Sequence, residues 1–352
     1  MAKRQSSLEG AKRAQRTGRA ADFTRQAVGA TRARRLSASQ VATATLLGQF
    51  VEAAYAMFQA NPGDPTPPPS PNFPAGYKLV AGIEMRDFII GGTEHLFYGF
   101  IAQSTTAANQ FVAAFRGTVG GVEWWDDFNS IVLTPFRVPG CGSVGAGFAR
   151  IYNTIALVAY PSAAASKTSL VERSVSSRGS LSQQVAALVS RHAPTAPEGK
   201  AAAPPVAISV TGHSLGSALA CLYVLENAKT NKLPTPIVCT LASPRVGDRA
   251  FVTAFNGLGL TSWRFAIDQD LVPQLPPEPF GFRHVNTLYP LNATGKVQPN
   301  FSCWHALTSY LSLVNLSLPP APACAIGTAV AARPLGLPGG ALDLSLNTGL
   351  AG

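Results

Sequence analysis

The pentapeptide Gly212–Gly216, with the sequence Gly-His-Ser-Leu-Gly, constrains the fold of this chain more than any other feature. Residues 206–211 before it are apolar and β-branched and predict a buried strand, and residues 217–225 after it predict a packed helix. Gly-x-Ser-x-Gly between a strand and a helix is the pattern of a nucleophile elbow. The two glycines leave room for a sharp turn, which holds Ser214 in a strained backbone conformation with its hydroxyl exposed at the top of a sheet.

Composition divides the 352 residues into three parts: a basic tail over 1–36, a globular domain over 37–317, and a Pro-, Ala- and Gly-rich extension over 318–352. A Ser- and Ala-rich stretch at about 161–181 has no apolar period and indicates an insertion. Expected strands cover 77–83, 85–90, 96–103, 111–115, 206–211, 236–243 and 260–267, and expected helices cover 37–58, 148–160, 181–192 and 217–225. Strands that alternate with helices predict an α/β fold, with a mostly parallel central sheet and helices on both faces.

The net charge of +10 is concentrated in the tail. Residues 1–36 hold ten Lys or Arg and two acidic residues, which gives +8 and leaves +2 for the rest of the chain. Such a tail is able to bind anionic lipid or an acidic partner, although a solubilising or targeting arm is the simpler interpretation, and nucleic acid is not expected as a partner. No secretory apolar core is visible in residues 1–40, and no apolar run reaches the ~20 residues of a membrane span. The expected location is therefore the cytoplasm, or the periphery of a membrane.

The five cysteines do not form a recognisable framework. Their number is odd and no short spacing repeats, which argues against a disulfide scaffold or a zinc site. No metal or organic cofactor is expected. Cys303 and Cys324 both lie near the C-terminus, so a bond between these two stays open.

A serine nucleophile needs a histidine base and a carboxylate that orients it. In the elbow fold class the chain order is Ser, then Asp or Glu, then His, which leaves His284 and His305 among the five histidines. His305 follows the last strand-like segment and enters a helix, a position typical of the base. His284 enters a strand, where local hydrogen bonding is the more natural role. We therefore favour His305.

For the acid, Asp270 follows the strand expected over 260–267, at the edge of the sheet where ligands bind. Asp268 is its main rival, and Asp248 lies in a loop where a carboxylate stabilises a turn. The oxyanion of the reaction needs backbone N–H donors that are already in place. Leu215, directly after the nucleophile, should supply one donor, and Thr118, after the strand at 111–115, is the best candidate for the other.

Several motifs occur together and in order. They are Phe115-Arg116-Gly117-Thr118, Trp124 to Asp127, Gly147-Phe148 to Tyr152, the elbow, Pro244-Arg245-Val246-Gly247, Asp270 to Pro277, and His305. Together they resemble the class 3 lipases, the fungal-type triacylglycerol lipases and their relatives. The resemblance implies an α/β-hydrolase fold, with Ser214 as nucleophile, Asp270 as acid, His305 as base, and Thr118 and Leu215 as the oxyanion hole. Ser217, where the family usually has a second glycine, is a departure.

The resemblance also places a lid at about 119–133, after Thr118. Trp124, Trp125 and Phe128 are interspersed with acidic residues there, so the segment is either an amphipathic lid that meets a lipid–water interface or ordinary packing. The expected function is a serine ester hydrolase acting on acylglycerols. Phospholipase A1 and feruloyl-type esterase are close alternatives, and a lipase-like scaffold without turnover is a third. The oligomeric state is not readable from the sequence.

Overall fold

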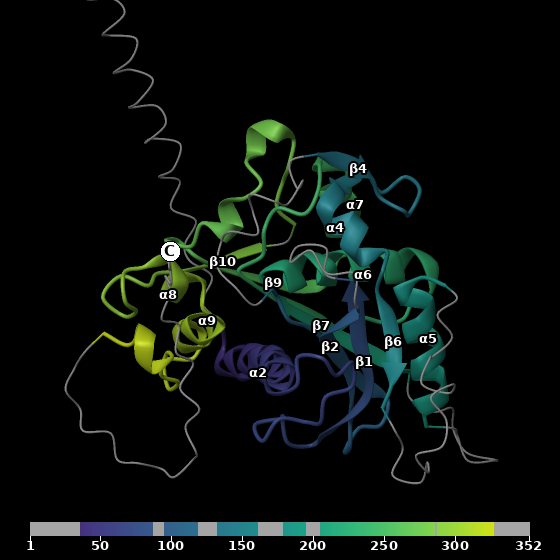
Figure 1. Ribbon diagram of the computed structural model, residues 1–352. Coiled ribbons are helices and arrows are strands. Elements are labelled where there is room, and N and C mark those ends of the chain that lie inside the picture. The colour runs from purple at the N-terminus through teal and green to yellow at the C-terminus, as the bar shows by residue number, and fades with distance from the viewer. Residues whose placement is uncertain are drawn as a thin grey trace, which may run out of the picture.

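A central sheet with helices on both faces forms the body of the protein (Figure 1). The computed structural model describes residues 36–86, 95–118, 132–160, 179–194, 205–285 and 287–326. Its eight-stranded sheet has the order β10-β9-β8-β7-β3-β2-β1-β6, and a separate hairpin pairs β4 with β5. The strands are β1 Tyr77–Arg86, β2 His95–Ser104, β3 Gln110–Phe115, β4 Leu133–Pro135, β5 Ser143–Gly145, β6 Ala156–Ala159, β7 Ala207–His213, β8 Ile237–Leu241, β9 Thr261–Ile267 and β10 Thr287–Leu291.

The sheet is parallel on one side and antiparallel on the other. Strands β3, β7, β8, β9 and β10 pair in parallel, whereas β2 pairs antiparallel with both β3 and β1, and β6 pairs antiparallel with β1. The carboxyl ends of the parallel strands meet at one edge of the sheet, which is where ligands bind in open α/β folds. This is the α/β-hydrolase arrangement that the sequence predicts.

Two groups of helices cover the two faces. The helices are α2 Ala38–Ala60, α4 Ala146–Tyr152, α5 Leu181–His192, α6 Leu215–Thr230, α7 Arg249–Asn256, α8 Phe301–His305 and α9 Leu307–Val314, with short 3₁₀ turns η1 Val272–Gln274, η2 Glu278–Phe280 and η3 Pro322–Cys324. One hydrophobic core joins the sheet to α4, α5, α6 and α7, and the other joins it to α2, α8 and α9. Figure 1 shows α2 and α9 on one side of the sheet and α5 on the other.

Helix α2 belongs to the core. Ser37 caps its N-terminus in a capping box with Gln40, and Phe50, Val51 and Ala54 are fully buried. By length and composition alone α2 is able to cross a membrane, but half of its most apolar stretch is buried inside the molecule. The packing of α2 against β7 and α9 therefore accounts for its apolar composition.

Two expectations about local structure differ from the structure. The strands expected at 77–83 and 85–90 are one strand, β1, as far as its described end at Arg86, with a register shift beside β2 between Ile83 and Glu84. The helix expected over 148–160 is wrong in its second half, because α4 ends at Tyr152 and residues 156–159 form β6. The free edge of β1 offers backbone hydrogen bonds to this short segment, and that pairing overrides its weak helical pattern.

Candidate active site

The elbow at Ser214 has the geometry that its two glycines predict. Ser214 lies between β7 and α6 with φ 55° and ψ −127°, a backbone conformation that a residue with a side chain adopts only under strain. A Cβ added at Gly212 would lie 2.4 Å from the Gly216 carbonyl oxygen, and one at Gly216 would lie 2.3 Å from the carbonyl oxygen of Phe115. Neither contact is possible without moving backbone, so both glycines are required by space.

Ser214, His305 and Asp270 form one hydrogen-bonded line. The Nε2 atom of His305 lies 2.9 Å from the Ser214 hydroxyl, and its Nδ1 atom lies 2.9 Å from a carboxylate oxygen of Asp270. Because an ionised carboxylate only accepts, Nδ1 carries the proton and Nε2 accepts from the serine. The structure thus brings together the three residues that the sequence predicts for the triad, in the tautomer that lets His305 take a proton from Ser214.

Asp270 is held from several directions. It is fully buried, its second oxygen accepts from the Val272 N–H at 3.0 Å, and the Tyr310 hydroxyl donates to it at 2.7 Å. The rival Asp268 is exposed. Asp248 instead caps α7 and accepts from the Ser143 N–H, as expected of a carboxylate that stabilises a turn.

His284, the other candidate base, lies outside this line. Burial, and to a lesser extent the neighbouring arginines Arg264 and Arg245, lower the pKa of His284 to about 3, so its imidazole stays neutral. Ser217 fits where the family has a glycine, since its hydroxyl lies 2.7 Å from the Gly212 carbonyl and 2.9 Å from that of Leu241.

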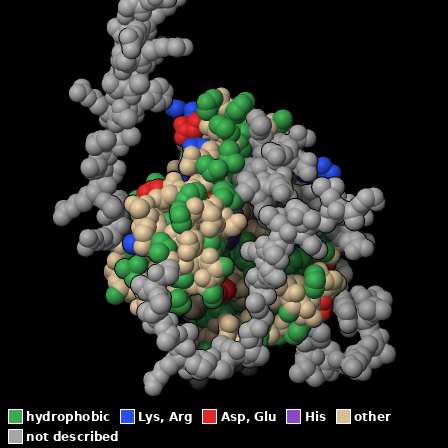
Figure 2. Space-filling model, turned by 60° about the vertical axis from the view of Figure 1, so that its left-hand side comes forward, with side chains coloured by type: hydrophobic (Ala, Val, Ile, Leu, Met, Phe, Trp, Pro, Cys, Tyr) green, Lys and Arg blue, Asp and Glu red, His purple; other side chains and the backbone are tan. Residues whose placement is uncertain are grey.

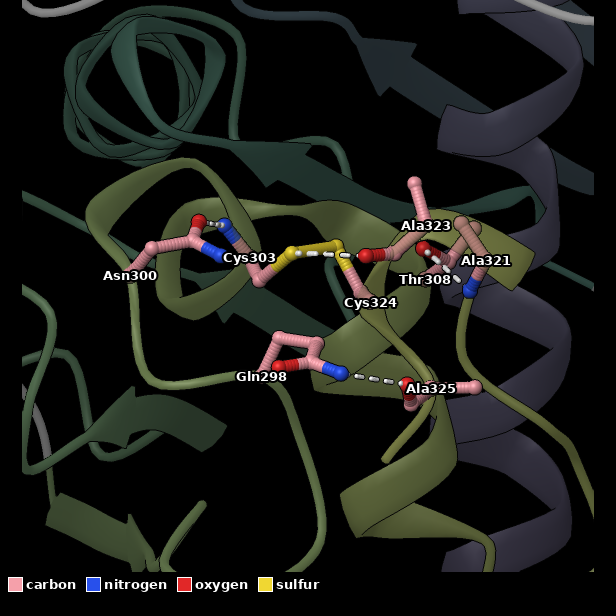
Figure 3. Close-up of a disulfide and its surroundings, with 8 residues drawn as sticks. All are labelled: Gln298, Asn300, Cys303, Thr308, Ala321, Ala323, Cys324 and Ala325. Atoms are coloured by element: carbon pink, nitrogen blue, oxygen red, sulfur yellow. Dashed lines mark hydrogen bonds between the residues drawn. A yellow bond between two sulfur atoms is a disulfide. The ribbon is translucent and has the colours of Figure 1, made fainter. Parts of the chain in front are cut away.

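A disulfide anchors the segment that carries His305. Cys303, in α8, is bonded to Cys324 in η3, twenty-one residues further along the chain (Figure 3). The Gln298 side chain also donates to the Ala325 carbonyl at 3.0 Å. The chain after α9 is therefore linked covalently to α8, the short helix that ends at His305. The pairing that the sequence left open is present.

The two oxyanion candidates lie beside Ser214. Leu215 is the first residue of α6, so its N–H is one of the helix-initial donors that have no partner inside the helix. The Thr118 hydroxyl is buried and has no hydrogen-bond partner among the described residues. A Cβ added at the neighbouring Gly117 would lie 2.9 Å from Cβ of Ser214, so this segment packs directly on the elbow. These positions suit an oxyanion hole, and that role stays a prediction.

Arg116 holds the same segment from inside the protein. Its guanidinium is buried between the rings of Phe58, at 3.6 Å, and Tyr98, at 4.0 Å. It donates to the Gly117 carbonyl at 2.6 Å and to the Phe97 carbonyl at 2.8 Å. The peptide before Thr118 is therefore fixed by a buried cation.

The candidate lid residues Trp124, Trp125 and Phe128 lie outside the described residues, as do the tail up to residue 35, most of the insertion and residues 327–352. Among the residues that the structure describes, no group of three or more His, Cys, Asp or Glu side chains is arranged to hold a metal ion.

Three side chains at the site were missed by the sequence reasoning. They are Tyr55 in α2, His213 at the end of β7 and Tyr310 in α9. The signal available for His213 and Tyr310 was nearness along the chain to Ser214 and His305. For Tyr55, 159 positions from Ser214, no local signal existed.

Comparisons with known proteins agree with this geometry. The sequence model of the family described as Lipase (class 3) matches residues 112–280. Phospholipase A1-II 4 of Oryza sativa subsp. japonica is 28% identical over 252 residues, which cover 66% of this chain and 58% of that protein. Secreted mono- and diacylglycerol lipase 1 of Fusarium solani is 27% identical over 244 residues, covering 68% and 60%. The chain thus spans less than two thirds of the length of these curated relatives.

A solved structure extends the comparison to the fold. The Rhizomucor miehei lipase propeptide complex has a TM-score of 0.51 and 20% identity, covering 73% of this chain and 70% of that one. Sheet topology and elbow are those of the α/β-hydrolase fold, and the hydrogen-bonded line of Ser214, His305 and Asp270 lies where that fold carries its catalytic residues. Over residues 112–280 the sequence matches the class 3 lipase family, as its ordered motifs predict.

Proposed function

We propose that this protein is a carboxylic ester hydrolase that cleaves acylglycerols through an acyl-enzyme on Ser214. The observation that carries the proposal is the line from Ser214 through His305 to the buried Asp270, with 2.9 Å at each hydrogen bond. A lipase-like scaffold without turnover has no use for a strained serine in contact with an oriented base.

In the proposed reaction, Ser214 Oγ attacks the ester carbonyl carbon while His305 Nε2 takes the hydroxyl proton. The negative charge on the former carbonyl oxygen is met by the Leu215 N–H and by Thr118. His305 then gives its proton to the departing alcohol oxygen, which leaves the acyl group on Ser214. Water, deprotonated by His305, attacks the acyl-enzyme, releases the carboxylic acid and restores the serine. Asp270 keeps the imidazole oriented and stabilises its charged form.

Support for a glycerolipid substrate comes from the names of the relatives, a mono- and diacylglycerol lipase and a phospholipase A1. The second name keeps phospholipase A1 activity as the alternative, because both reactions use the same triad. An assay with trioctanoin beside phosphatidylcholine separates them. We expect faster release of fatty acid from trioctanoin. Faster release from phosphatidylcholine would make phospholipase A1 the main activity and acylglycerol hydrolysis the secondary one.

The decisive experiment measures hydrolysis of p-nitrophenyl esters from acetate to palmitate by wild type and Ser214→Ala. We expect a loss of about 10⁴-fold or more in kcat for Ser214→Ala, because the nucleophile is removed while the fold is kept. Retention of most of the activity in a variant purified free of contaminating esterase would sink the proposal.

Contact with a lipid–water interface is part of the same proposal. Leu271 and Phe280, on the loop that follows Asp270, are 51% and 53% exposed, and Figure 2 shows hydrophobic side chains gathered at the top of the molecule over this loop. A lid containing Trp124, Trp125 and Phe128 would add to this apolar surface on opening. The rate with tributyrin should jump at its solubility limit. A smooth hyperbola across that limit would count against the interface.

The basic tail is proposed to strengthen binding to anionic membranes. Its charge of +8 supports the idea, since each Lys or Arg near an anionic surface contributes about 1 kcal/mol. Deletion of residues 1–36 should reduce sedimentation with phosphatidylserine vesicles, and equal sedimentation of both proteins would reject it.

The disulfide favours an oxidising compartment over the cytoplasm that the sequence suggests, because such bonds persist mainly outside reducing compartments. Alkylation of the denatured, unreduced protein from its native source should modify only Cys141, Cys221 and Cys239, the three free thiols. Modification of all five cysteines would place the protein in a reducing compartment.

A further inference from the structure

Tyr55 lies between the segment that carries the oxyanion candidate Thr118 and the strand end that leads to Ser214. Its hydroxyl accepts the Gly117 N–H at 2.8 Å, directly before the oxyanion candidate Thr118. The same hydroxyl lies 2.9 Å from Nδ1 of His213. One side chain of α2 therefore contacts both the oxyanion segment and the residue next to the nucleophile.

His213 continues the connection to the base. Its Nε2 atom lies 3.0 Å from the backbone carbonyl oxygen of His305, and the two imidazole rings pack with centroids 4.9 Å apart. A carbonyl only accepts, so Nε2 of His213 carries the proton and Nδ1 accepts from the Tyr55 hydroxyl. The donors run in one direction, from Gly117 N–H to Tyr55 O–H to Nδ1 of His213, and from its Nε2–H to His305.

The ionisation of both side chains suits this chain of hydrogen bonds. Burial, and to a lesser extent nearby His305, lower the pKa of His213 well below its ordinary value, so the ring stays neutral. Burial also raises the pKa of Tyr55 to about 12, so its hydroxyl keeps the proton that it donates. Hydrogen bonds in such a chain strengthen one another.

The space around Tyr55 leaves this hydroxyl little freedom. A Cβ at Gly117 would lie 2.5 Å from the Tyr55 oxygen, so the glycine permits the approach. The ring packs edge-on to His213 with centroids 5.8 Å apart. With Arg116 holding the Gly117 carbonyl, both polar groups of Gly117 are bonded to side chains.

We infer that Tyr55 is a positioning residue. Through the Gly117 N–H it holds the oxyanion segment, and through His213 it holds the backbone of His305, so that both keep their places relative to Ser214. The inference rests on the proposed function, since it concerns the same ester hydrolysis. It assigns to the N-terminal helix α2, outside the residues matched by the family model, a part in the reaction. Tyr55 itself need not touch the substrate.

The test is Tyr55→Phe, which keeps the ring and removes the hydroxyl. We expect kcat for p-nitrophenyl butyrate to fall about tenfold or more, because small displacements of catalytic groups are costly. KM should change less than twofold, since a residue that acts by positioning the catalytic groups does not itself bind the substrate. The matched control is Tyr160→Phe, which removes a tyrosine hydroxyl that donates to the Pro67 carbonyl at 2.8 Å, away from the triad. This control should lower thermal stability by a similar amount and leave kcat unchanged.

A double-mutant cycle tests the route through His213. His213→Gln keeps a donor that is able to reach the His305 carbonyl and removes the ring nitrogen that Tyr55 contacts. If the two residues act as one unit, adding Tyr55→Phe to His213→Gln costs less than Tyr55→Phe costs in wild type. Fully additive losses would overturn the connection through His213.

Two further outcomes overturn the inference. They are an unchanged kcat in Tyr55→Phe, and an equal loss of kcat in Tyr160→Phe, which would show general destabilisation. Failure of the proposed function looks different, because wild type and Ser214→Ala would then hydrolyse the ester equally. The comparison of those two proteins is made first, with the same substrate.

Discussion

Ser214, the proposed nucleophile, and its two hydrogen-bonded partners are held in place by different physical means. Ser214 is held by backbone, since Gly212 and Gly216 let β7, α6 and the end of β3 approach within contact distance. Asp270 and His305 are held by side chains, because hydrogen bonds from Tyr310 and His213 and a disulfide beside α8 position them. One half of the site depends on shape and the other on polar contacts.

This difference predicts two kinds of failure. A clash between backbone atoms cannot be relieved locally, so damage to the elbow should appear first as lost stability. Polar contacts are removable one at a time, so damage around Asp270 and His305 should appear first as lost rate. The following substitutions test whether the two halves separate in this way.

The largest expected effect is on rate, in Asp270→Asn. An amide of similar shape no longer stabilises the charged imidazole and favours the wrong tautomer of His305, so kcat should fall about 10⁴-fold, or ~5.5 kcal/mol. The midpoint of thermal unfolding should stay close to that of wild type. Asp268→Asn, which changes an exposed carboxylate two residues away, is the control and should leave both quantities unchanged. A large loss of stability in Asp270→Asn, with no specific loss of kcat, would erase the contrast between the two halves.

The largest expected effect on stability is in Gly216→Ala. The added methyl would lie 2.3 Å from the Phe115 carbonyl oxygen and 2.5 Å from that of Arg116, and both belong to the strand end that leads to Thr118. Overpacking of this kind costs about 3 kcal/mol of the free energy of unfolding. Urea denaturation measures it, with Gly63→Ala as control, because a Cβ there meets nothing within 4 Å. If Gly216→Ala unfolds at the wild-type urea concentration and loses only kcat, the elbow is not held by shape.

Removal of the disulfide should affect both quantities. Replacing Cys303 and Cys324 by serine frees a segment of twenty-one residues, which costs roughly 3 kcal/mol of stability in the chain-entropy view. Because Cys303 lies two residues before His305, kcat should fall as well, by less than tenfold. Thermal unfolding with and without dithiothreitol measures the first effect. The double variant should not respond to the reductant, and a response as large as that of wild type would show that another group is being reduced.

Sequence reasoning predicted the parts of the site that depend on local pattern or chain order. The elbow is encoded in consecutive residues. The strand before Asp270 and the helix after His305 have regular patterns, so both residues could be assigned to the edge of the sheet that carries Ser214. The fold class followed from the same alternation and is confirmed by the sheet topology.

The parts that could not be predicted depend on contacts between distant segments. Whether Tyr55 reaches Gly117 depends on how α2 packs on the sheet. This packing cannot be read from any short stretch of the sequence. Strand β6 was missed because four residues after a helix carry too little pattern, and only the open edge of β1 selects their conformation. Asp270 was predicted from its place in the chain. Its hydrogen bond with Tyr310 could not be predicted, because that contact depends on how α9 packs against the end of β9.

The smallest expected effect is in Tyr310→Phe, which removes one of the contacts of Asp270. The hydroxyl donates to the carboxylate at 2.7 Å and accepts from the Ile267 N–H at 3.1 Å. Burial and the neighbouring carboxylate raise the pKa of Tyr310 well above its ordinary value, so it donates throughout the working range. Its removal should cost about 1 kcal/mol of stability and reduce kcat several-fold.

The pH profile of Tyr310→Phe makes this prediction specific. The hydrogen bond that Tyr310 donates disperses the negative charge of Asp270, so its loss leaves a carboxylate that holds the protonated imidazole of His305 more strongly. The acidic limb of the kcat/KM profile should therefore move to higher pH than in wild type, while the profile of Tyr289→Phe, on the edge strand β10, stays in place. An acidic limb that does not move, together with a lower kcat, would mean that Tyr310 acts by placing the loop after β9 and leaves the charge on Asp270 unaltered. Asp270 would then be held mainly by backbone, as Ser214 is, and the distinction between the two halves of the site would be one of degree.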